Sequence, residues 1–262
     1  MNGLAADAKT LLELKNVSRS FGGIQAVRDM SFKVEEGGLT GLIGPNGAGK
    51  TTVFNLITAV YSVTGGEMEF DGKNINSLRT YEVISRGIAR TFQNLRLFTR
   101  SSVLDNVVTA AQQHYKYTFF EAMTHMGRWR GMERAMRAES MELLERVGLA
   151  DRAEQSAGTL PYGLQRRLEI ARAIALRPTL LLLDEPAAGM NADEVVDLNN
   201  LIVNIHSDFN LTILLIEHHM DVIMSICPHI VCMNFGAKIA EGTPDEIRRH
   251  PEVLKAYLGE EE

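Results

Sequence analysis

The sequence predicts an α/β protein: a buried, largely parallel sheet, an N-terminal antiparallel β subdomain and an inserted α-helical subdomain. Three short apolar runs are typical of strands buried on both faces of such a sheet: residues 39–43, 179–184 and 211–216. Residues 11–21 instead alternate between polar and apolar side chains, as half-buried strands do. Residues 101–157 differ from both, because their apolar side chains recur at helical spacing.

The composition fits an ordinary globular protein and argues against several kinds of partner. The chain has 262 residues, 45% hydrophobic and 23% charged, enough for one large domain or a core with an inserted subdomain. The net charge of -6 argues against nucleic acid and against binding to anionic lipid by charge alone. Cys227 and Cys232 form no disulfide framework or zinc pattern, so we expect a reducing compartment.

No stretch of the sequence is expected to enter a membrane. The longest apolar runs, such as residues 211–216, are far too short to span a bilayer. The first ten residues lack the basic flank and the apolar stretch of a secretion signal. We therefore expect a cytoplasmic protein that reaches a membrane only through a partner.

The N-terminal strands are joined by a turn that carries a candidate base-stacking residue. Residues 11–21 and 30–34 are predicted strands, and Gly22 and Gly23 mark the turn after Phe21. The Phe21 ring could fold back toward a downstream nucleotide site, where adenine would stack on it. A core phenylalanine that closes the hairpin is an equally good interpretation.

Residues 44–52, GPNGAGKTT, fit the phosphate-binding pattern G-x-x-x-x-G-K-[ST]. Gly44 and Gly49 let the backbone curl so that its N–H groups face phosphate oxygens. Lys50 can reach the β and γ phosphates, and the Thr51 hydroxyl can bind Mg²⁺. A strand-like run precedes the loop and a helix-like run follows it, so the loop lies at a helix N-terminus, which favours anions. This context makes a nucleotide site a better interpretation than a chance glycine-rich turn.

The segment after this loop predicts a hairpin and then a functional loop. Residues 64–75 carry turn signals at Gly65-Gly66 and at Asp71-Gly72. Residues 86–98 run from a strand-like piece into a loop that contains Gln93.

Residues 101–157 are predicted to be wholly helical, with Gly148 ending the last helix. Within them, residues 115–137 mix aromatic, methionine and arginine side chains. Such a helix could lie on a membrane or bind a partner. The interpretation we favour is a two-sided helix that covers the subdomain core and exposes its arginines, with His114 and His125 on the surface.

A helix at residues 160–178, ended by Pro178, leads into a run that ends in two acids. Residues 179–186 are typical of a buried parallel strand, which delivers Asp184 and Glu185 to the edge where α/β sheets bind ligands. Asp184 suits Mg²⁺, and Glu185 can accept a proton from, or orient, an attacking water. An acidic pair that merely caps the strand is the alternative.

The C-terminal third alternates helices and strands: a helix at 193–209, a strand at 211–220 with His218 at its end, a hairpin at 229–242 and two short helices at 243–259.

Several of these segments together resemble the nucleotide-binding subunits of ABC transporters over nearly the whole chain: TFQNLRLF, YGLQRRLEIARAI, LLLLDEPAAGMN, LLIEHHM and AYLG. Within that superfamily the chain looks most like the ATPase subunits of bacterial branched-chain amino-acid importers. The resemblance implies a P-loop NTPase (RecA-like) core at residues 11–98 and 158–262, with a helical subdomain inserted at residues 99–157.

The resemblance also implies a role for each matching residue. The phosphate-cradling loop corresponds to Asn46, Gly47, Ala48, Gly49, Lys50, Thr51 and Thr52. Phe21 matches the adenine-stacking aromatic residue, and Gln93 matches the glutamine that reaches Mg²⁺ and the attacking water. Asp184 matches the metal-binding acid, Glu185 the general base, and His218 the histidine at the γ-phosphate. Thr51, Gln93 and Asp184 would hold Mg²⁺, and ATP would be the nucleotide.

The segment that completes the site of the opposite subunit departs from the family pattern LSGGQ. It corresponds to Leu160, Pro161, Tyr162, Gly163 and Leu164, of which Leu160 and Gly163 keep the usual residue. Pro161 has neither the hydroxyl nor the N–H that serine would offer a phosphate. We therefore expect a heterodimer with a second ATPase subunit whose signature is fuller, giving two unequal sites.

The resemblance implies an ATPase that powers import of branched-chain or similar amino acids. Its partners would be two transmembrane permease subunits and an extracytoplasmic substrate-binding protein, with no nucleic acid. The chain would lie at the cytoplasmic face of the inner membrane. The alternatives are the ATPase of a related exporter, such as that for lipopolysaccharide, and a soluble regulatory ATPase. A small-molecule kinase would also use the phosphate loop but would need an acceptor pocket and a cationic lid.

Overall fold

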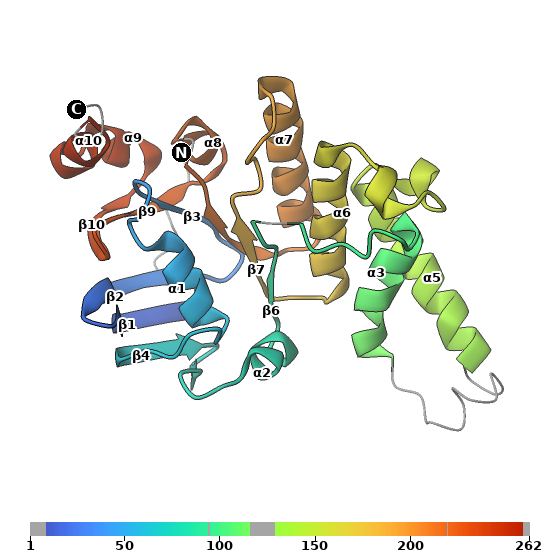
Figure 1. Ribbon diagram of the computed structural model, residues 1–262, viewed down its shortest axis with the longest axis horizontal. Helices are drawn as coiled ribbons and strands as arrows, with labels where there is room; N and C mark the ends of the chain where they lie inside the picture. The colour runs from blue at the N-terminus through green and yellow to red at the C-terminus, as the bar shows by residue number, and fades with distance from the viewer. Residues whose placement is uncertain (1–8, 94, 116–128, 219, 259–262) are drawn as a thin grey trace.

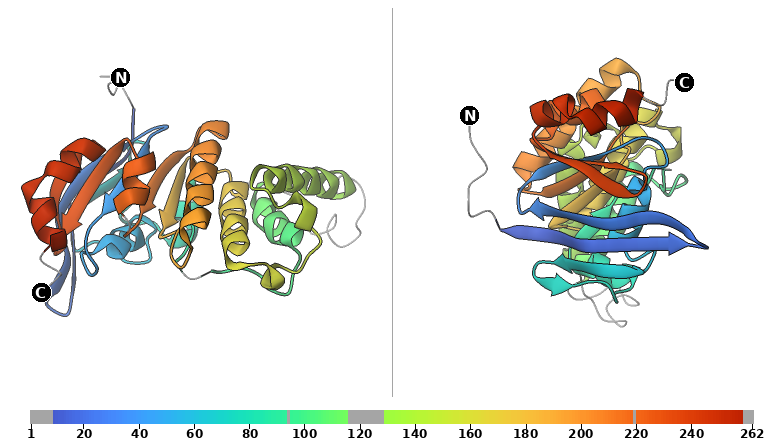
Figure 2. Two further views of the ribbon diagram at one scale, coloured as in Figure 1. Left: turned by 90° about the horizontal axis from the view of Figure 1, so that it is seen from above. Right: turned by 90° about the vertical axis from the view of Figure 1, so that its left-hand side faces the viewer.

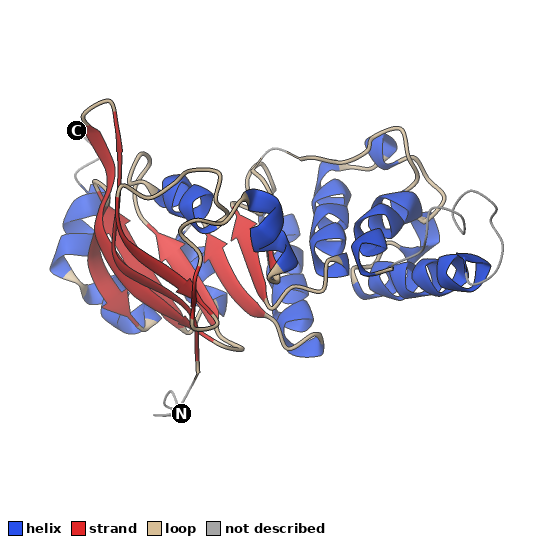
Figure 3. Ribbon diagram, turned by 90° about the horizontal axis from the view of Figure 1, so that it is seen from below, coloured by secondary structure: helices blue, strands red, loops and turns tan. Residues whose placement is uncertain are grey.

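The computed structural model describes residues 9–258 except 94, 116–128 and 219. Two sheets and their covering helices form the body of the described chain (Figure 1). The strands gather in one half of the molecule, and the other half is mainly helical (Figure 3). The predicted α/β class is confirmed.

The smaller sheet is the predicted antiparallel unit. Its described strands are β1 (Thr10–Phe21), β2 (Ile24–Glu35), β4 (Gly65–Phe70) and β5 (Lys73–Asn74), in the order β2-β1-β4-β5. The Gly22-Gly23 turn joins β1 to β2, as predicted. The inward-facing side chains of this sheet, such as Leu12 and Leu14, are buried.

The larger sheet contains the three apolar runs that the sequence singled out. Its described strands are β3 (Leu39–Ile43), β6 (Ile88–Arg90), β7 (Leu180–Asp184), β8 (Thr212–Ile216), β9 (His229–Asn234) and β10 (Ala237–Gly242), in the order β10-β9-β3-β8-β7-β6. The pairs from β9 to β6 are parallel, and β10 is antiparallel to β9. Every residue of β3, β7 and β8 is buried, which explains their continuous hydrophobicity.

The two faces of the larger sheet belong to two cores. Leu180 and Leu182 face a core shared with the antiparallel sheet and with Phe54 of α1 (Lys50–Ile57). Leu181 and Leu183 face the opposite core. The helices of this second core include α6 (Tyr162–Ala175), α7 (Ala192–Asp208) and α8 (Met220–Ile226). Because both faces are covered, the sheet presents its carboxyl edge, rather than a face, to ligands.

Smaller helices complete the α/β part of the chain: α2 (Thr80–Ser85), α9 (Pro244–Arg249) and α10 (Pro251–Leu258). The last two pack against the β9–β10 hairpin. Viewed from above, they lie at the end of the molecule opposite the helices of the inserted segment (Figure 2).

The inserted segment contributes α3 (Val103–Ala111) and α5 (Trp129–Arg146), which pack against each other and against α6. The prediction that residues 101–157 are wholly helical is wrong, because residues 147–149 and 153–156 are not helical; short 3-10 turns lie at residues 112–114, 150–152 and 157–159. Tyr115 has extended backbone, and its hydroxyl donates to Glu139 Oε2 at 2.8 Å. His114 is exposed as predicted, whereas His125 and most of the predicted helix at residues 115–137 lie outside the described residues.

The predicted turn at Gly65-Gly66 is wrong, although the turn at Asp71-Gly72 is present. Gly65 and Gly66 begin β4, where the register with β1 shifts between Lys15 and Ser18. The extra residue is on β1, because three steps from Lys15 to Ser18 face two steps from Glu67 to Gly65; Gly66, with a φ of 81°, lies opposite this bulge.

Among the residues that the structure describes, no helix combines the length and the apolarity needed to cross a membrane.

We predict that Gly66→Ala destabilises the protein more than Gly72→Ala, although both residues have positive φ. A Cβ at residue 66 would lie 2.2 Å from the Asn16 carbonyl oxygen, whereas a Cβ at residue 72 meets no described atom within 4 Å. Gly72→Ala should lower the free energy of unfolding by about 1 kcal/mol. Gly66→Ala should lower it by about 3 kcal/mol, since strand backbone must also move. Urea unfolding measures both, and equal losses would contradict the bulge geometry.

Candidate nucleotide site

The predicted phosphate loop connects β3 to α1. Gly49 precedes the helix with a φ of 104°, and a Cβ there would lie 2.5 Å from the Ala26 carbonyl oxygen. The first backbone bond into the helix runs from Val53 N–H to the Gly49 carbonyl, at 3.0 Å. The amides of Thr51 and Thr52 therefore belong to the first turn, whose N–H groups point out of the helix end and suit phosphate oxygens.

Lys50 is held inside the curve of this loop. Its side chain is buried, with 4% of the residue exposed. The ammonium group donates to the Gly44 carbonyl at 2.5 Å and to the Pro45 carbonyl at 2.9 Å. These contacts fix a positive charge among the loop amides, where β and γ phosphates are expected.

Asp184 ends β7 and pairs with an arginine that the sequence reasoning missed. Its Oδ2 accepts from Arg90 Nη2 at 2.5 Å, and Arg90 also donates to Asn55 Oδ1 at 2.7 Å. Burial raises the pKa of Asp184, and the hydrogen bond and charge of Arg90 oppose that rise. Asp184 Oδ1 is buried and has no hydrogen-bond partner among the described residues.

Glu185 points away from Arg90 and lies between two other predicted residues. Gln93 Nε2 donates to Glu185 Oε2 at 2.6 Å, and His218 Nε2 lies 2.6 Å from Glu185 Oε1. Glu185 has a φ of 49°, and its N–H donates to the Ile216 carbonyl at 2.9 Å. This left-handed step turns the second acid of the pair toward the loop of Gln93 and the end of β8.

These groups meet in one cavity of about 320 Å³. Its lining consists of Ala26, Asn46, Gly47, Gly49, Lys50, Thr51, Thr52, Gln93, Glu185 and His218. The structure thus brings together the phosphate loop, the glutamine, one acid and the histidine. Of the catalytic, nucleotide-binding and metal-binding residues predicted for this chain's own site, Phe21, Ala48 and Asp184 are not in that lining. The Ala48 side chain is buried, so only its backbone could serve a phosphate.

Phe21 lies at the tip of the β1–β2 hairpin and is 37% exposed, so it is not a buried core residue. Its ring makes an edge contact with Tyr61, with centroids 5.0 Å apart. The Arg19 guanidinium lies over the ring at 4.5 Å from its centroid. Adenine stacking on Phe21 stays a prediction.

The predicted signature segment lies at the start of α6, away from the lining of this cavity. Pro161 is the N-cap residue and makes no side-chain capping bond. Leu160 is buried, whereas Tyr162 is 42% exposed. A Cβ at Gly163 would lie 3.4 Å from Glu194 Oε1, and Leu164 packs against the core.

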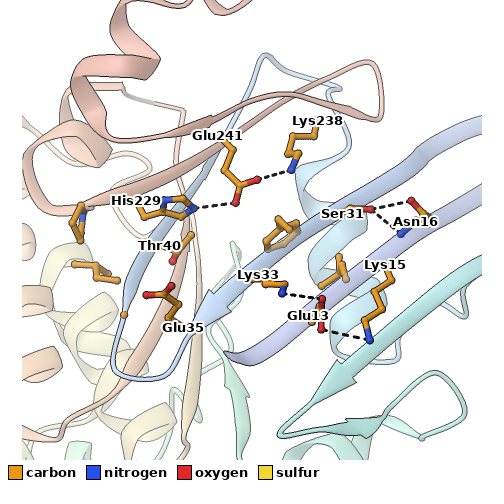
Figure 4. A pocket seen from close by; sticks show the side chains of 15 residues that line it. Glu13, Lys15, Asn16, Ser31, Lys33, Glu35, Thr40, His229, Lys238 and Glu241 are labelled. Atoms are coloured by element: carbon orange, nitrogen blue, oxygen red, sulfur yellow. Dashed lines mark hydrogen bonds and ion pairs between the residues drawn. The ribbon is translucent and has the colours of Figure 1, made fainter. Parts of the chain in front are cut away.

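A larger hollow, of about 540 Å³, lies between strands β1 and β2 and the β9–β10 hairpin (Figure 4). Most of its charged side chains form ion pairs with one another: Glu241 with His229 and Lys238, and Glu13 with Lys15 and Lys33. None of the predicted site residues lines it. Size alone therefore does not identify the nucleotide site.

Glu217 is a second charged group that the sequence reasoning missed. It is 1% exposed, and its Oε1 accepts from the Ala187 N–H at 2.7 Å. Its Oε2 accepts from the His218 N–H at 3.3 Å. The carboxylate therefore ties the segment after Glu185 to the histidine. An acid directly after an apolar strand was the available signal.

The residues present fit a magnesium ion. The unpartnered Oδ1 of Asp184 and the hydroxyl of Thr51, which lines the cavity, are hard oxygen donors. No group of three or more His, Cys, Asp or Glu side chains in the described part of the chain could hold a metal by itself. That composition suits Mg²⁺, which is usually held by one or two protein groups together with substrate phosphates and water.

Comparison with known proteins places this chain in a family. Residues 27–188 match the ABC transporter family, and residues 237–262 match the family of branched-chain amino acid ATP-binding cassette transporters. The chain is 46% identical over 253 residues to the high-affinity branched-chain amino acid transport ATP-binding protein BraF of Pseudomonas aeruginosa, covering 97% of this chain and 99% of that protein. It is 40% identical over 253 residues to LivG of Escherichia coli, with the same description and the same coverage.

A solved structure shares the fold. The ADP conformation of MJ1267, an ATP-binding cassette of an ABC transporter, matches with a TM-score of 0.83 and 29% identity, covering 95% of this chain and 99% of that one. The family model spans more than half of the chain, and both relatives match over nearly its full length. The chain therefore belongs to the ABC transporter family, as an ATP-binding protein of its branched-chain amino acid branch.

Proposed function

We propose that this protein hydrolyses ATP to drive import of branched-chain or similar amino acids through separate transmembrane subunits. The observation that carries the proposal is the single cavity in which the phosphate loop, Gln93, Glu185 and His218 meet. The branched-chain family match and the two full-length relatives support branched-chain amino acids, rather than lipopolysaccharide, as the substrate class.

Nucleotide binding rests on the loop between β3 and α1. Lys50 offers a buried charge to the β and γ phosphates, and the amides of Gly47, Gly49 and the first turn of α1 offer N–H donors. Asn46 lines the same cavity, and Phe21 is our candidate for stacking on adenine. Thr51 and Asp184, with Gln93, would hold Mg²⁺, which when bound neutralises phosphate charge.

Hydrolysis requires a group that orients water and accepts its proton, and Glu185 has this role in the proposal. Its carboxylate is 4% exposed, and each oxygen has one partner, Gln93 or His218. Because Gln93 and His218 contact different oxygens of Glu185, they fix the plane of its carboxylate. A lone pair that is not used in these contacts then has a fixed direction in which it can accept a proton from water. His218 lines the same cavity as Lys50 and is our candidate for contacting the γ phosphate.

The surface that we propose for binding a membrane subunit lies beside Gln93. An apolar groove of about 290 Å³ lies among α2, β6, α3 and α6. Its lining includes Phe92, next to Gln93, together with Val83, Phe98 and Ala110. A helix from a transmembrane subunit would bury this apolar surface. It would then hold the chain at the cytoplasmic face of the membrane.

The altered signature supports unequal sites. Serine is a good N-cap residue whose side chain and amide can both face a phosphate, and Pro161 offers neither donor. This chain would therefore help its neighbour's site less than it serves its own. A second ATPase subunit whose signature segment keeps more of the LSGGQ residues would supply the phosphate donors that this chain lacks. An extracytoplasmic binding protein would deliver the amino acid.

We predict that Glu185→Gln keeps nucleotide binding and loses hydrolysis. The amide preserves the shape of the side chain but cannot accept a proton, so kcat should fall about a hundredfold or more. The Kd for Mg·ATP should stay within about twofold, because the phosphate contacts remain. Glu145→Gln, an exposed carboxylate on α5, is the control. Unchanged turnover in Glu185→Gln would remove Glu185 from the mechanism.

Lys50→Ala should weaken nucleotide binding itself. Loss of a charged hydrogen bond to phosphate corresponds to about a tenfold to hundredfold rise in Kd. Calorimetric titration with Mg·ATP measures it. Lys33→Ala removes a lysine of 61% side-chain exposure on β2 and should leave Kd unchanged. Equal affinities for the two variants would contradict the assignment of the phosphate loop.

The assembly should contain membrane subunits and a different ATPase subunit. Affinity purification of the full-length chain from solubilised membranes, followed by mass spectrometry, should recover transmembrane proteins and one copy of this chain per complex. A stoichiometric ATP-dependent homodimer with two equally fast sites would contradict the heterodimer. A chain that never fractionates with membranes would contradict the transport function.

A further inference from the structure

Two charged side chains of α6 hold the backbone of the loop that carries Gln93. The side chain of Arg166 is fully buried. Its Nη1 donates to the Phe92 carbonyl at 2.7 Å, and its Nη2 donates to the Gln93 carbonyl at 2.9 Å. These contacts join residues more than seventy positions apart in the chain, so they anchor the loop to the helix rather than to its own neighbours.

Glu169, one turn further along α6, completes the contact. The Phe92 N–H donates to Glu169 Oε1 at 3.2 Å, and Arg166 Nη1 donates to Glu169 Oε2 at 2.7 Å. Burial raises the pKa of Glu169, and the positive charge of Arg166 opposes that rise. Both the N–H and the carbonyl of Phe92 are thus bound by one ion pair.

A buried ion pair is a weak source of stability, because removing two charges from water costs about as much as their attraction returns. Its better-attested use is to specify one geometry. The planar guanidinium suits this use, since its donors diverge at fixed angles toward two successive carbonyl groups. A lysine ammonium, as a point charge on a flexible stem, cannot reproduce both contacts.

The same arginine also reaches the signature segment. Arg166 Nη2 donates to the Tyr162 hydroxyl at 2.9 Å, and Tyr162 begins α6. On the other side, the side chain of Gln93 donates to Glu185. A continuous set of hydrogen bonds therefore runs from Tyr162 through Arg166 and Gln93 to Glu185.

We propose that Arg166 and Glu169 are positioning residues: they link the position of α6 to the geometry of the hydrogen bond between Gln93 and Glu185. We call this pair the α6 clamp. The inference rests on the proposed function, because it gives Gln93 and Glu185 their roles in hydrolysis. A shift of α6, which carries the signature segment toward the neighbouring subunit, moves the Gln93 backbone with it and so changes the support of the Glu185 carboxylate.

The test is a double-mutant cycle on kcat, with the full-length chain assembled with the subunits that co-purify with it. Arg166→Met should lower kcat at least about tenfold, with the Kd for Mg·ATP within about twofold of wild type. Gln93→Ala should give a similar loss. The kcat of the double variant should be no more than about twofold below that of the slower single variant, because Arg166 acts through Gln93. A purely structural role would instead lower the melting temperature and multiply the two losses.

Two further variants complete the design. Arg167→Met removes the next arginine of α6, which contacts the Val147 carbonyl and Asp197 instead, and should keep wild-type kcat. Arg166→Lys keeps the buried charge beside Glu169 but cannot bridge both carbonyl groups, so its kcat should still fall severalfold at an unchanged Kd. It replaces Arg166→Met in the cycle if the latter does not fold.

If the losses of kcat in Arg166→Met and Gln93→Ala multiply in the double variant, or if Arg166→Lys keeps the wild-type kcat, the proposed role of the α6 clamp is wrong. Either result leaves the proposed ATPase function unaffected. A wild-type assembly without ATP hydrolysis, or a Gln93→Ala variant with unchanged kcat, would instead remove the functional role on which the clamp depends.

Discussion

The structure depends on three parallel strands that lie side by side and end at the same level. In the larger sheet β8 lies between β3 and β7, and Ile216 pairs with both Leu42 and Asp184. The segments that follow these strands are the phosphate loop, the two acids and His218. Because parallel strands share one carboxyl edge, three segments from distant parts of the chain converge without any long loop. The Glu185 N–H to Ile216 carbonyl bond continues this alignment one residue beyond the strand.

This convergence concentrates charge at the edge of an apolar sheet, and the surrounding residues compensate it. Asp184 is paired with Arg90, Glu185 with Gln93 and His218, and Glu217 with the backbone of Ala187 and His218. Each acid is almost fully buried, so its position is fixed by partners rather than by solvent. Such a site is pre-organised for the proposed function, because the groups proposed to bind a nucleotide and orient its attacking water are held at the ends of buried strands.

Helix α6, against which α3 and α5 pack, contacts the loop that carries Gln93. The residue stripe of Arg166, Glu169 and Arg172 binds backbone groups of Phe92, Gln93 and Arg96. One helix thus touches the loop of this chain's own site and begins with the segment predicted to serve the neighbouring site. A hydrogen-bonded connection of this kind couples two places only if the helix has two positions, and the hydrolysis cycle would supply them.

The α/β class, the phosphate loop, the acids at the end of β7 and the histidine after β8 could be predicted from the sequence, because each signal lies within a few consecutive residues. Turn signals were less decisive, since Gly65 and Gly66 lie in β4, opposite a bulge of β1, where a turn was predicted. The partners of the buried arginines depend on how the elements pack: Arg90 reaches Asp184, and Arg166 reaches the Gln93 carbonyl, across chain separations of 94 and 73 residues. An arginine buried on a helix gives no local sign of its partner, because that partner is set by how the elements pack and not by the periodicity of either one.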